Sequence, residues 1–153
     1  MKKYFILCVL VILVFGVACK KSYTPIYDFS GNNWDFQQPI NFNLKITDTT
    51  STYSIFLFFR NTIEYPYQNI YFLIQTQYEN EIIQRDTVEY AITNKYGNWL
   101  GSGIGKTKDN YFIVKEQQEF QKDGVYTVSI QHGMRKNPLR GANKIGLKLT
   151  KND

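Results

Sequence analysis

The sequence predicts an all-β fold, a single antiparallel β-sandwich of about eight strands in a jelly-roll-like arrangement. Three observations support this prediction. Several segments alternate apolar and polar residues, which is the pattern of a strand with one buried face. Turn residues separate these segments at short spacing, and no apolar pattern of helical period extends beyond about two turns. Aromatic residues, which favour strands, make up 16% of the chain.

The first residues predict export. Two lysines precede an apolar run over 4–17, and Ala18 and Cys19 follow it. The run is shorter than the about 20 residues of a membrane-spanning helix and is typical of a secretory signal. A cysteine directly after a small residue predicts a lipoprotein signal peptide over 1–18, with a diacylglycerol on the sulfur of Cys19. Gly16 departs from the apolar residue usual at its position. An uncleaved anchor is the alternative, and it too would hold the protein outside the cytoplasm.

Cleavage would leave one domain that folds on its hydrophobic core alone. Cys8 would leave with the signal, and Cys19 would carry the lipid, so the mature domain could form no disulfide. We expect 19–35 to be a lipid-anchored lead segment and 36–153 to be the β-sandwich domain. The net charge of +5 is too small to indicate a nucleic-acid partner.

The first two predicted strands differ in pattern. Residues 39–46 alternate cleanly, with polar side chains on one face and apolar ones on the other. The apolar set is Ile40, Phe42, Leu44 and Ile46. Residues 53–59 are apolar on both faces. A strand of that kind is either central and covered on both sides, or lies at a sheet edge beside aromatic partners.

Further strands are predicted along the rest of the chain, with a turn at 79–81 between the first two of them. They are 69–77, 82–92, a short strand at 111–115, one beginning at Gly124, and 144–151. The expected inward-facing side chains are Ile70, Phe72 and Ile74, then Val88, Tyr90 and Ile92, then Tyr126, Val128 and Ile130, and finally Ile145, Leu147 and Leu149. Only 116–122 and 134–140 could hold a helical turn.

The motifs predict neither an enzyme nor a cofactor or metal site. Residues 101–107 resemble a phosphate loop, but the glycine spacing is wrong and a strand follows where a helix is required. His132 is the only histidine, the acids lack the spacing of a calcium loop, and no nucleophile elbow is present. A pair of carboxylates that meets only in the fold is the one catalytic arrangement that the sequence leaves open.

Some residues at strand ends and loops are unusual for a purely structural role, and binding residues tend to lie in such places. Arginine and exposed aromatic side chains favour interfaces and sugar-stacking sites. The candidate partner- or ligand-binding residues are Arg60, Tyr65, Tyr67, Trp99, Met134 and Arg135. In the alternative interpretation, Trp99 and Met134 fill the ends of the core, while Arg60 and Arg135 bind loop carbonyls.

These residues belong to an ordered set of short motifs that extends from Cys19 to the end of the chain. The set comprises the signal ending in Cys19, Arg60 with Tyr65-Pro66-Tyr67-Gln68-Asn69, Gly97-Asn98-Trp99-Leu100-Gly101-Ser102-Gly103, Gly124-x-Tyr126 leading to Gln131-His132-Gly133-Met134-Arg135, Leu139-Arg140-Gly141, and Ile145-Gly146-Leu147. In this order the motifs resemble GldH, the gliding-motility lipoprotein family of Bacteroidetes. The sequence departs from that pattern at Ala142, where isoleucine is expected.

The resemblance implies a lipid-anchored, non-catalytic structural or interaction component of the gliding-motility machinery. Its expected partners are other Gld proteins and the type IX secretion machinery, and the only functional position it transfers is Cys19. Relatives also occur in bacteria that do not glide, so a role in envelope machinery is the broader expectation. Residues 20–23 lack the acidic cluster of surface-exported lipoproteins, which indicates a periplasm-facing protein of the cell envelope.

A lipid-anchored carbohydrate-binding module is the alternative function, with a glycan as its partner. β-Sandwiches that expose tryptophan and tyrosine often stack these rings on sugars. Such a module should show a flat, exposed platform of two or more aromatic rings, whereas an interaction subunit should show a mixed patch of apolar side chains and arginine.

Overall fold

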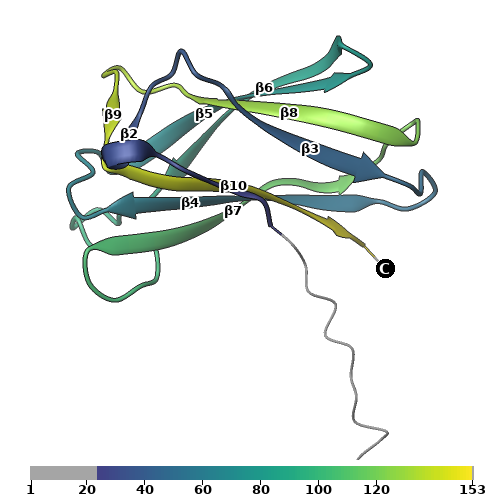
Figure 1. Cartoon of the computed structure of the whole chain (residues 1–153). Helices are drawn as coiled ribbons and strands as arrows, with labels where there is room; N and C mark the ends of the chain where they lie inside the picture. Colours follow the sequence, from purple (N-terminus) through teal and green to yellow (C-terminus); the bar gives the residue numbers. More distant parts are fainter. Residues whose placement is uncertain (1–23, 153) are drawn as a thin grey trace, which may run out of the picture.

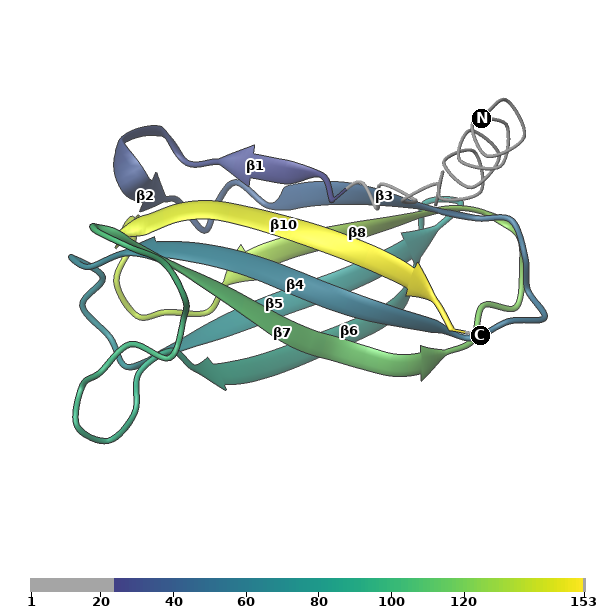
Figure 2. The same cartoon turned by 90° about the horizontal axis from the view of Figure 1, so that it is seen from below.

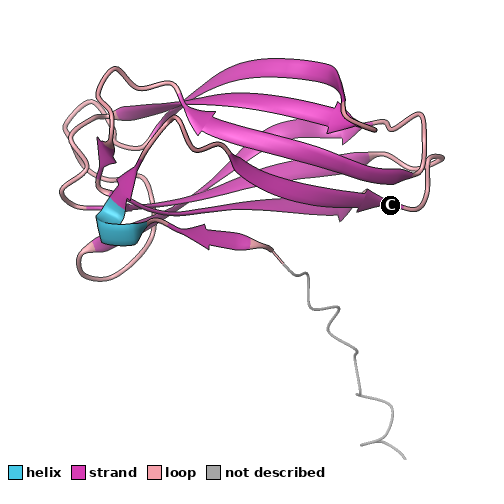
Figure 3. Cartoon of the chain, turned by 45° about the horizontal axis from the view of Figure 1, so that its top comes forward, coloured by secondary structure: helices cyan, strands magenta, loops and turns pink. Residues whose placement is uncertain are grey.

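The computed structural model describes residues 24–152 as two antiparallel sheets packed face to face (Figures 1 and 3). Sheet 1 has the strand order β1–β10–β4–β7, formed by Ile26–Asp28, Ala142–Lys151, Tyr53–Thr62 and Thr107–Gln118. Sheet 2 has the order β3–β8–β5–β6, formed by Ile40–Ile46, Gly124–His132, Asn69–Tyr78 and Glu81–Ala91. A small sheet pairs β2 (Asn33–Trp34) with β9 (Leu139–Arg140), and the short 3₁₀ turn η1 spans Ser30–Asn32.

The strand order is that of a jelly roll. If the two-residue strands β2 and β9 are left out and the other eight are renumbered along the chain, sheet 1 reads 1-8-3-6 and sheet 2 reads 2-7-4-5. Each sheet thus alternates early and late strands, as in two interleaved Greek keys. The predicted antiparallel β-sandwich is confirmed.

The core follows the alternation seen in the sequence. All four apolar residues of β3 are buried, and the inward positions of β5 and β8 are buried as well. Ile145 and Leu147 bury the inner face of β10. The inner face of β6 is different, because Val88 and Tyr90 are only partly buried there.

Three segments differ from the expectation. Residues 26–34, placed in the lead segment by the sequence analysis, contribute β1 to sheet 1 and the buried Trp34 to the core. The short strand expected at 111–115 is the twelve-residue strand β7. The possible helical turns at 116–122 and 134–140 are not helical, since the first continues β7 into bends and the second is a loop that enters β9.

The N-terminal signal and Cys19 lie outside the described residues. Within 24–152, no helix is both long enough and apolar enough to span a membrane. At the end of the sandwich that holds the β5–β6 and β7–β8 connections, a cavity of about 300 Å³ opens between the sheets. Its walls are apolar, with side chains such as Leu44, Ile74 and Val114, and its rim is polar.

Candidate interaction surface

Long connections gather at the opposite end of the sandwich, which we call the loop end (Figure 2). They are residues 63–68, 92–106 and 133–138, and the small β2–β9 sheet lies beside them. Five of the six candidate binding residues lie on these connections, and Arg60 lies near the end of β4 that enters the first of them. The fold therefore brings all six candidates to one end of the domain.

Tyr65 is a core residue of this end. It is 4% exposed, its ring packs at 5.9 Å from Phe59 and 5.8 Å from the partly buried Tyr67, and its hydroxyl donates to the Asn69 carbonyl at 3.0 Å. Burial raises the pKa of the Tyr65 hydroxyl. Gly141 lies directly against it: a Cβ there would be 2.6 Å from the Tyr65 Cα, and the φ of +81° also favours glycine. Tyr65 thus holds the first connection in place.

Met134 and His132 hold the third connection. The Tyr71 amide donates to Met134 Sδ at 3.4 Å, and the Met134 amide donates to His132 Nδ1 at 3.3 Å. Because Nδ1 accepts, Nε2–H of His132 donates to the Trp34 carbonyl at 3.0 Å. His132 is 2% exposed, and burial lowers its pKa. Arg135, the next residue after Met134, is exposed.

Trp99 ties the second connection to the core while its neighbours extend outward. Trp99 is partly buried against the core and forms a β-bridge with Thr93, and the Leu100 amide donates to the Ile92 carbonyl at 2.9 Å. Large apolar side chains nearby remain exposed. They are Tyr96, Leu100, Ile104 and, on the first connection, Ile63. The Ile63 amide donates to the carbonyl of Lys106 at 2.9 Å, which joins the two connections.

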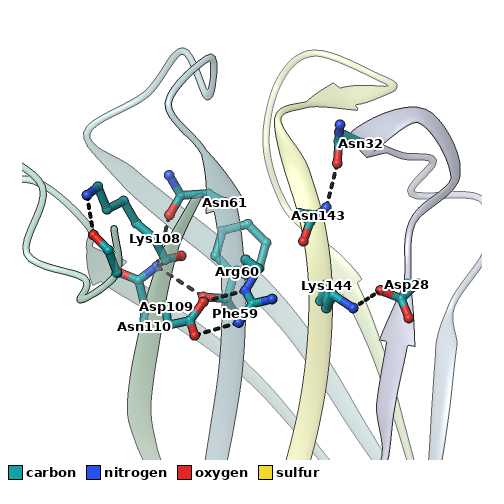
Figure 4. Close-up of polar contacts among 11 residues, drawn as sticks. Asp28, Asn32, Phe59, Arg60, Asn61, Lys108, Asp109, Asn110, Asn143 and Lys144 are labelled. Carbon is teal, nitrogen blue, oxygen red and sulfur yellow. Dashed lines mark hydrogen bonds and ion pairs between the residues drawn. The ribbon is translucent and has the colours of Figure 1, made fainter. Parts of the chain in front are cut away.

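Arg60 belongs to a charged row that crosses all four strands of sheet 1 (Figure 4). The register aligns Asp28, Lys144, Arg60 and Asp109 in this order. Lys144 pairs with Asp28 at 2.5 Å, and Arg60 donates to both carboxylate oxygens of Asp109, from Nε and, at 2.7 Å, from Nη2. The Asp109 carboxylate raises the pKa of the Arg60 guanidinium. Each inner cation of this row therefore has an outer acid as its partner.

Buried amides fasten β4 to β7 beneath the charged row, and sequence reasoning missed them. Asn110 Nδ2 donates to Asn61 Oδ1 at 2.9 Å and to the Phe59 carbonyl at 3.0 Å, while Asn61 Nδ2 donates to the Thr62 carbonyl at 2.9 Å. Both asparagines are buried, and such polar groups are stable inside a protein only when bonded. The signal that could have found them is an asparagine at the inward position of each strand.

The site's chemistry fits binding. Within residues 24–152, no group of three or more histidine, cysteine, aspartate or glutamate side chains is placed to hold a metal ion. Both ring nitrogens of the buried His132 are engaged in hydrogen bonds within the protein, so this side chain is not presented to a ligand. The exposed groups at the loop end include apolar side chains, Arg135, the Arg140–Glu64 ion pair at 2.8 Å, and three lysines, Lys95, Lys106 and Lys136.

Comparison with known proteins gives concordant matches. The family model described as GldH lipoprotein matches residues 21–149. The chain is 33% identical over 149 residues to the gliding motility lipoprotein GldH homolog of Christiangramia forsetii, an alignment that covers 93% of this chain and 91% of that protein. It is 26% identical over 155 residues to the gliding motility lipoprotein GldH of Flavobacterium johnsoniae, covering 97% and 96% of the two chains.

Proposed function

The chain belongs to the GldH lipoprotein family, and from this premise we propose that it is a lipid-anchored, non-catalytic interaction component of the gliding-motility machinery. In this proposal Cys19 carries the lipid and the domain faces the periplasm. Its partners are other gliding-motility proteins linked to type IX secretion. The names of the two relatives support the motility role, and the predicted signal peptide supports the anchor.

The exposed apolar side chains of the loop end carry the docking part of this proposal. Tyr96 is 76% exposed and Leu100 is 60% exposed, although the loop that bears them is fixed to the core by Trp99. Asn94 Oδ1 also accepts from the Tyr96 and Asn98 amides at 2.9 and 3.0 Å, which orders the loop tip. Apolar side chains that are exposed on an ordered loop, with arginine nearby, are typical of a protein interface.

Carbohydrate binding finds less support. Trp99, the best ring for stacking on a sugar, packs partly buried against the core. No ring contact joins two of the four exposed rings of residues 24–152: Tyr27, Phe36 and Tyr111 each contact a buried ring, namely Phe29, His132 and Phe58. The fourth, Tyr96, has the Lys95 ammonium 5.0 Å from its ring centre. A flat aromatic surface is what a sugar-stacking module would need.

Affinity purification of the lipidated full chain from its own membranes tests the docking proposal. We expect other gliding-motility proteins to co-purify with the wild type, and Leu100→Asp to lower their recovery at least tenfold. The matched control is Val125→Asp, because Val125 is 52% exposed on β8 at the other end of the domain. Equal recovery with Leu100→Asp would contradict the proposed docking surface. Recovery of no protein, together with binding to a glycan array, would favour the carbohydrate alternative.

A further inference from the structure

The outer face of sheet 1 carries an apolar patch next to its charged row. The register aligns Ile26, Gly146, Phe58 and Tyr111 across the four strands, and it pairs Phe56 with Ile113 in the following row. The apolar patch, as we call it, comprises Ile26, Phe56, Phe58, Tyr111 and Ile113. The apolar patch explains why β4 is apolar on both faces. Leu57 and Phe59 fill the core, whereas Phe56 and Phe58 lie on the outer face.

Much of the apolar patch is open to solvent. Tyr111 is 70% exposed, Ile26 is 50% exposed and Ile113 is 49% exposed. The Tyr111 ring packs at 5.1 Å from the buried Phe58 ring. A groove of about 290 Å³ runs across the patch, lined by Thr24, Phe56, Phe58, Tyr111 and Lys148. Contiguous exposed apolar surface of this kind marks a contact with a partner or a membrane.

The polypeptide enters the domain at this groove. Thr24, the first described residue, is one of its lining residues. The chain then packs directly against β10 at the edge of the sheet, because a Cβ added to Gly146 would be 2.9 Å from the Pro25 carbonyl oxygen. Five residue steps lead back from Thr24 to Cys19, and a fully extended chain of that length spans at most about 18 Å. A lipid on Cys19 would therefore be held within about 18 Å of Thr24 at the edge of the apolar patch.

We propose that the outer face of sheet 1 lies against the membrane that holds the lipid, with the apolar patch in the headgroup region. This inference rests on the lipid attachment in the proposed function. The tether limits which face can reach the bilayer, and a tyrosine ring with apolar neighbours suits the membrane interface.

The charges around the patch agree with a lipid surface that contains anionic headgroups. Lys148 lines the groove, and Lys20 and Lys21 directly follow the lipidated cysteine. Basic groups at an anionic membrane surface gain about 1 kcal/mol each. Two acids of this face, Asp28 and Asp109, are each paired with a cation of the charged row, so they do not add unpaired negative charge to it.

Single-cysteine labelling tests the orientation. Cys8 leaves with the signal and the sulfur of Cys19 is acylated, so an introduced cysteine is the only free thiol of the mature chain. The lipidated protein is reconstituted into vesicles of phosphatidylethanolamine with a minor fraction of phosphatidylglycerol. The variants Ile113→Cys and Ser129→Cys each carry an environment-sensitive fluorophore, and a lipid spin-labelled at the headgroup is the quencher. Ser129 is the matched position, on the outer face of sheet 2.

We expect the fluorophore at 113 to be quenched at least threefold more strongly than the fluorophore at 129. Equal quenching, or stronger quenching at 129, on protein that floats with the vesicles would overturn the orientation and leave the lipid anchor intact. Protein that does not float would overturn the anchor and the orientation together. In whole cells, a photo-crosslinker at 113 should capture lipid, and capture of a protein would show that a protein covers the apolar patch instead.

Discussion

The two sheets bury similar inner faces and present different outer faces. Sheet 2 carries mostly polar side chains outward, and β3 and β8 are linked through them: Thr127 donates to Asn43 at 3.1 Å, and Ser129 donates to Asn41 at 2.6 Å. Leu73 and Val125, 41% and 52% exposed, also lie on this face, but several residues apart along the paired strands β5 and β8. Sheet 1 carries the charged row and the apolar patch. The outer face of sheet 2 is therefore a mainly polar surface with scattered apolar side chains, whereas that of sheet 1 gathers its apolar side chains into one patch suited to contact. The following predictions test that contrast.

The largest expected effect is at Gly146 on β10, where the chain entering β1 packs directly against the strand. In Gly146→Val, the new side chain would meet the Pro25 carbonyl oxygen and push β1 off β10. We expect the free energy of unfolding to fall by about 2 kcal/mol, as for other overpacked sites. Ser129→Val on sheet 2 removes the exposed hydrogen bond to Asn41 and should lower the free energy of unfolding by less, about 0.5–1 kcal/mol. Urea unfolding measures both changes, and equal stability of Gly146→Val and wild type would contradict the tight contact between residue 25 and β10.

The next effect concerns the charged row. Arg60→Ala removes the two hydrogen bonds between the Arg60 and Asp109 side chains, which are 31% and 24% exposed. We expect the free energy of unfolding to fall by about 0.5–1 kcal/mol, and by less at high salt. The control is Arg140→Ala, because the Arg140–Glu64 pair is 71% and 63% exposed and should contribute little. Urea unfolding at low and high salt measures these losses. If both variants lost the same free energy of unfolding, the charged row would not be a stabilising feature of sheet 1.

A smaller, pH-dependent effect belongs to sheet 2, because β8 ends at the buried His132. Burial lowers its pKa below the ordinary 6.5, so the unfolded chain binds a proton more readily than the folded one. Stability should therefore fall as the pH drops below 6.5. Thermal unfolding between about pH 5 and 7 measures this.

His132→Gln is the matched control, because the chain has no other histidine. The nearby Asp35 titrates below its ordinary 3.8 and lies outside this pH window. Persistence of the full pH dependence in His132→Gln would assign it to other groups.

The smallest expected effect on stability is that of making sheet 1 resemble sheet 2. The double variant Tyr111→Thr with Ile113→Thr replaces exposed apolar side chains by polar, strand-favouring ones, so the free energy of unfolding should change by less than about 0.5 kcal/mol. Solubility of the protein should rise because the apolar patch shrinks. A loss above about 1 kcal/mol in urea unfolding would show that the patch serves the fold rather than contact.

The fold could be predicted from the sequence because alternation reports directly on burial. The clean pattern of β3 placed Ile40, Phe42, Leu44 and Ile46 in the core, where they lie. The β1 strand could not be predicted in this way, since three residues are too few to show a period. It forms because residues 26–28 pair with β10, which follows more than a hundred residues later.

The candidate site was predictable only in outline. Strand ends and unusual side chains pointed to the loop end, but they did not separate the buried Tyr65 from the exposed Arg135. Burial at a strand end depends on residues distant in sequence, such as Gly141 against Tyr65. The outward extension of Leu100 likewise depends on Trp99 packing against the core.

The pairing of β1 with β10 also determines how the domain would bear mechanical load. Tension between a lipid on Cys19 and a partner held at the loop end would pass through β1, which runs toward that end (Figure 2). Hydrogen bonds between strands lie across the strand axis, so a pull along β1 loads them together in shear, whereas a pull away from the sheet would break them one at a time. Just beyond β1, the Phe29 amide donates to the Asn143 carbonyl at 2.9 Å and shares this load. The domain would thus resist traction along its long axis better than lifting from its surface.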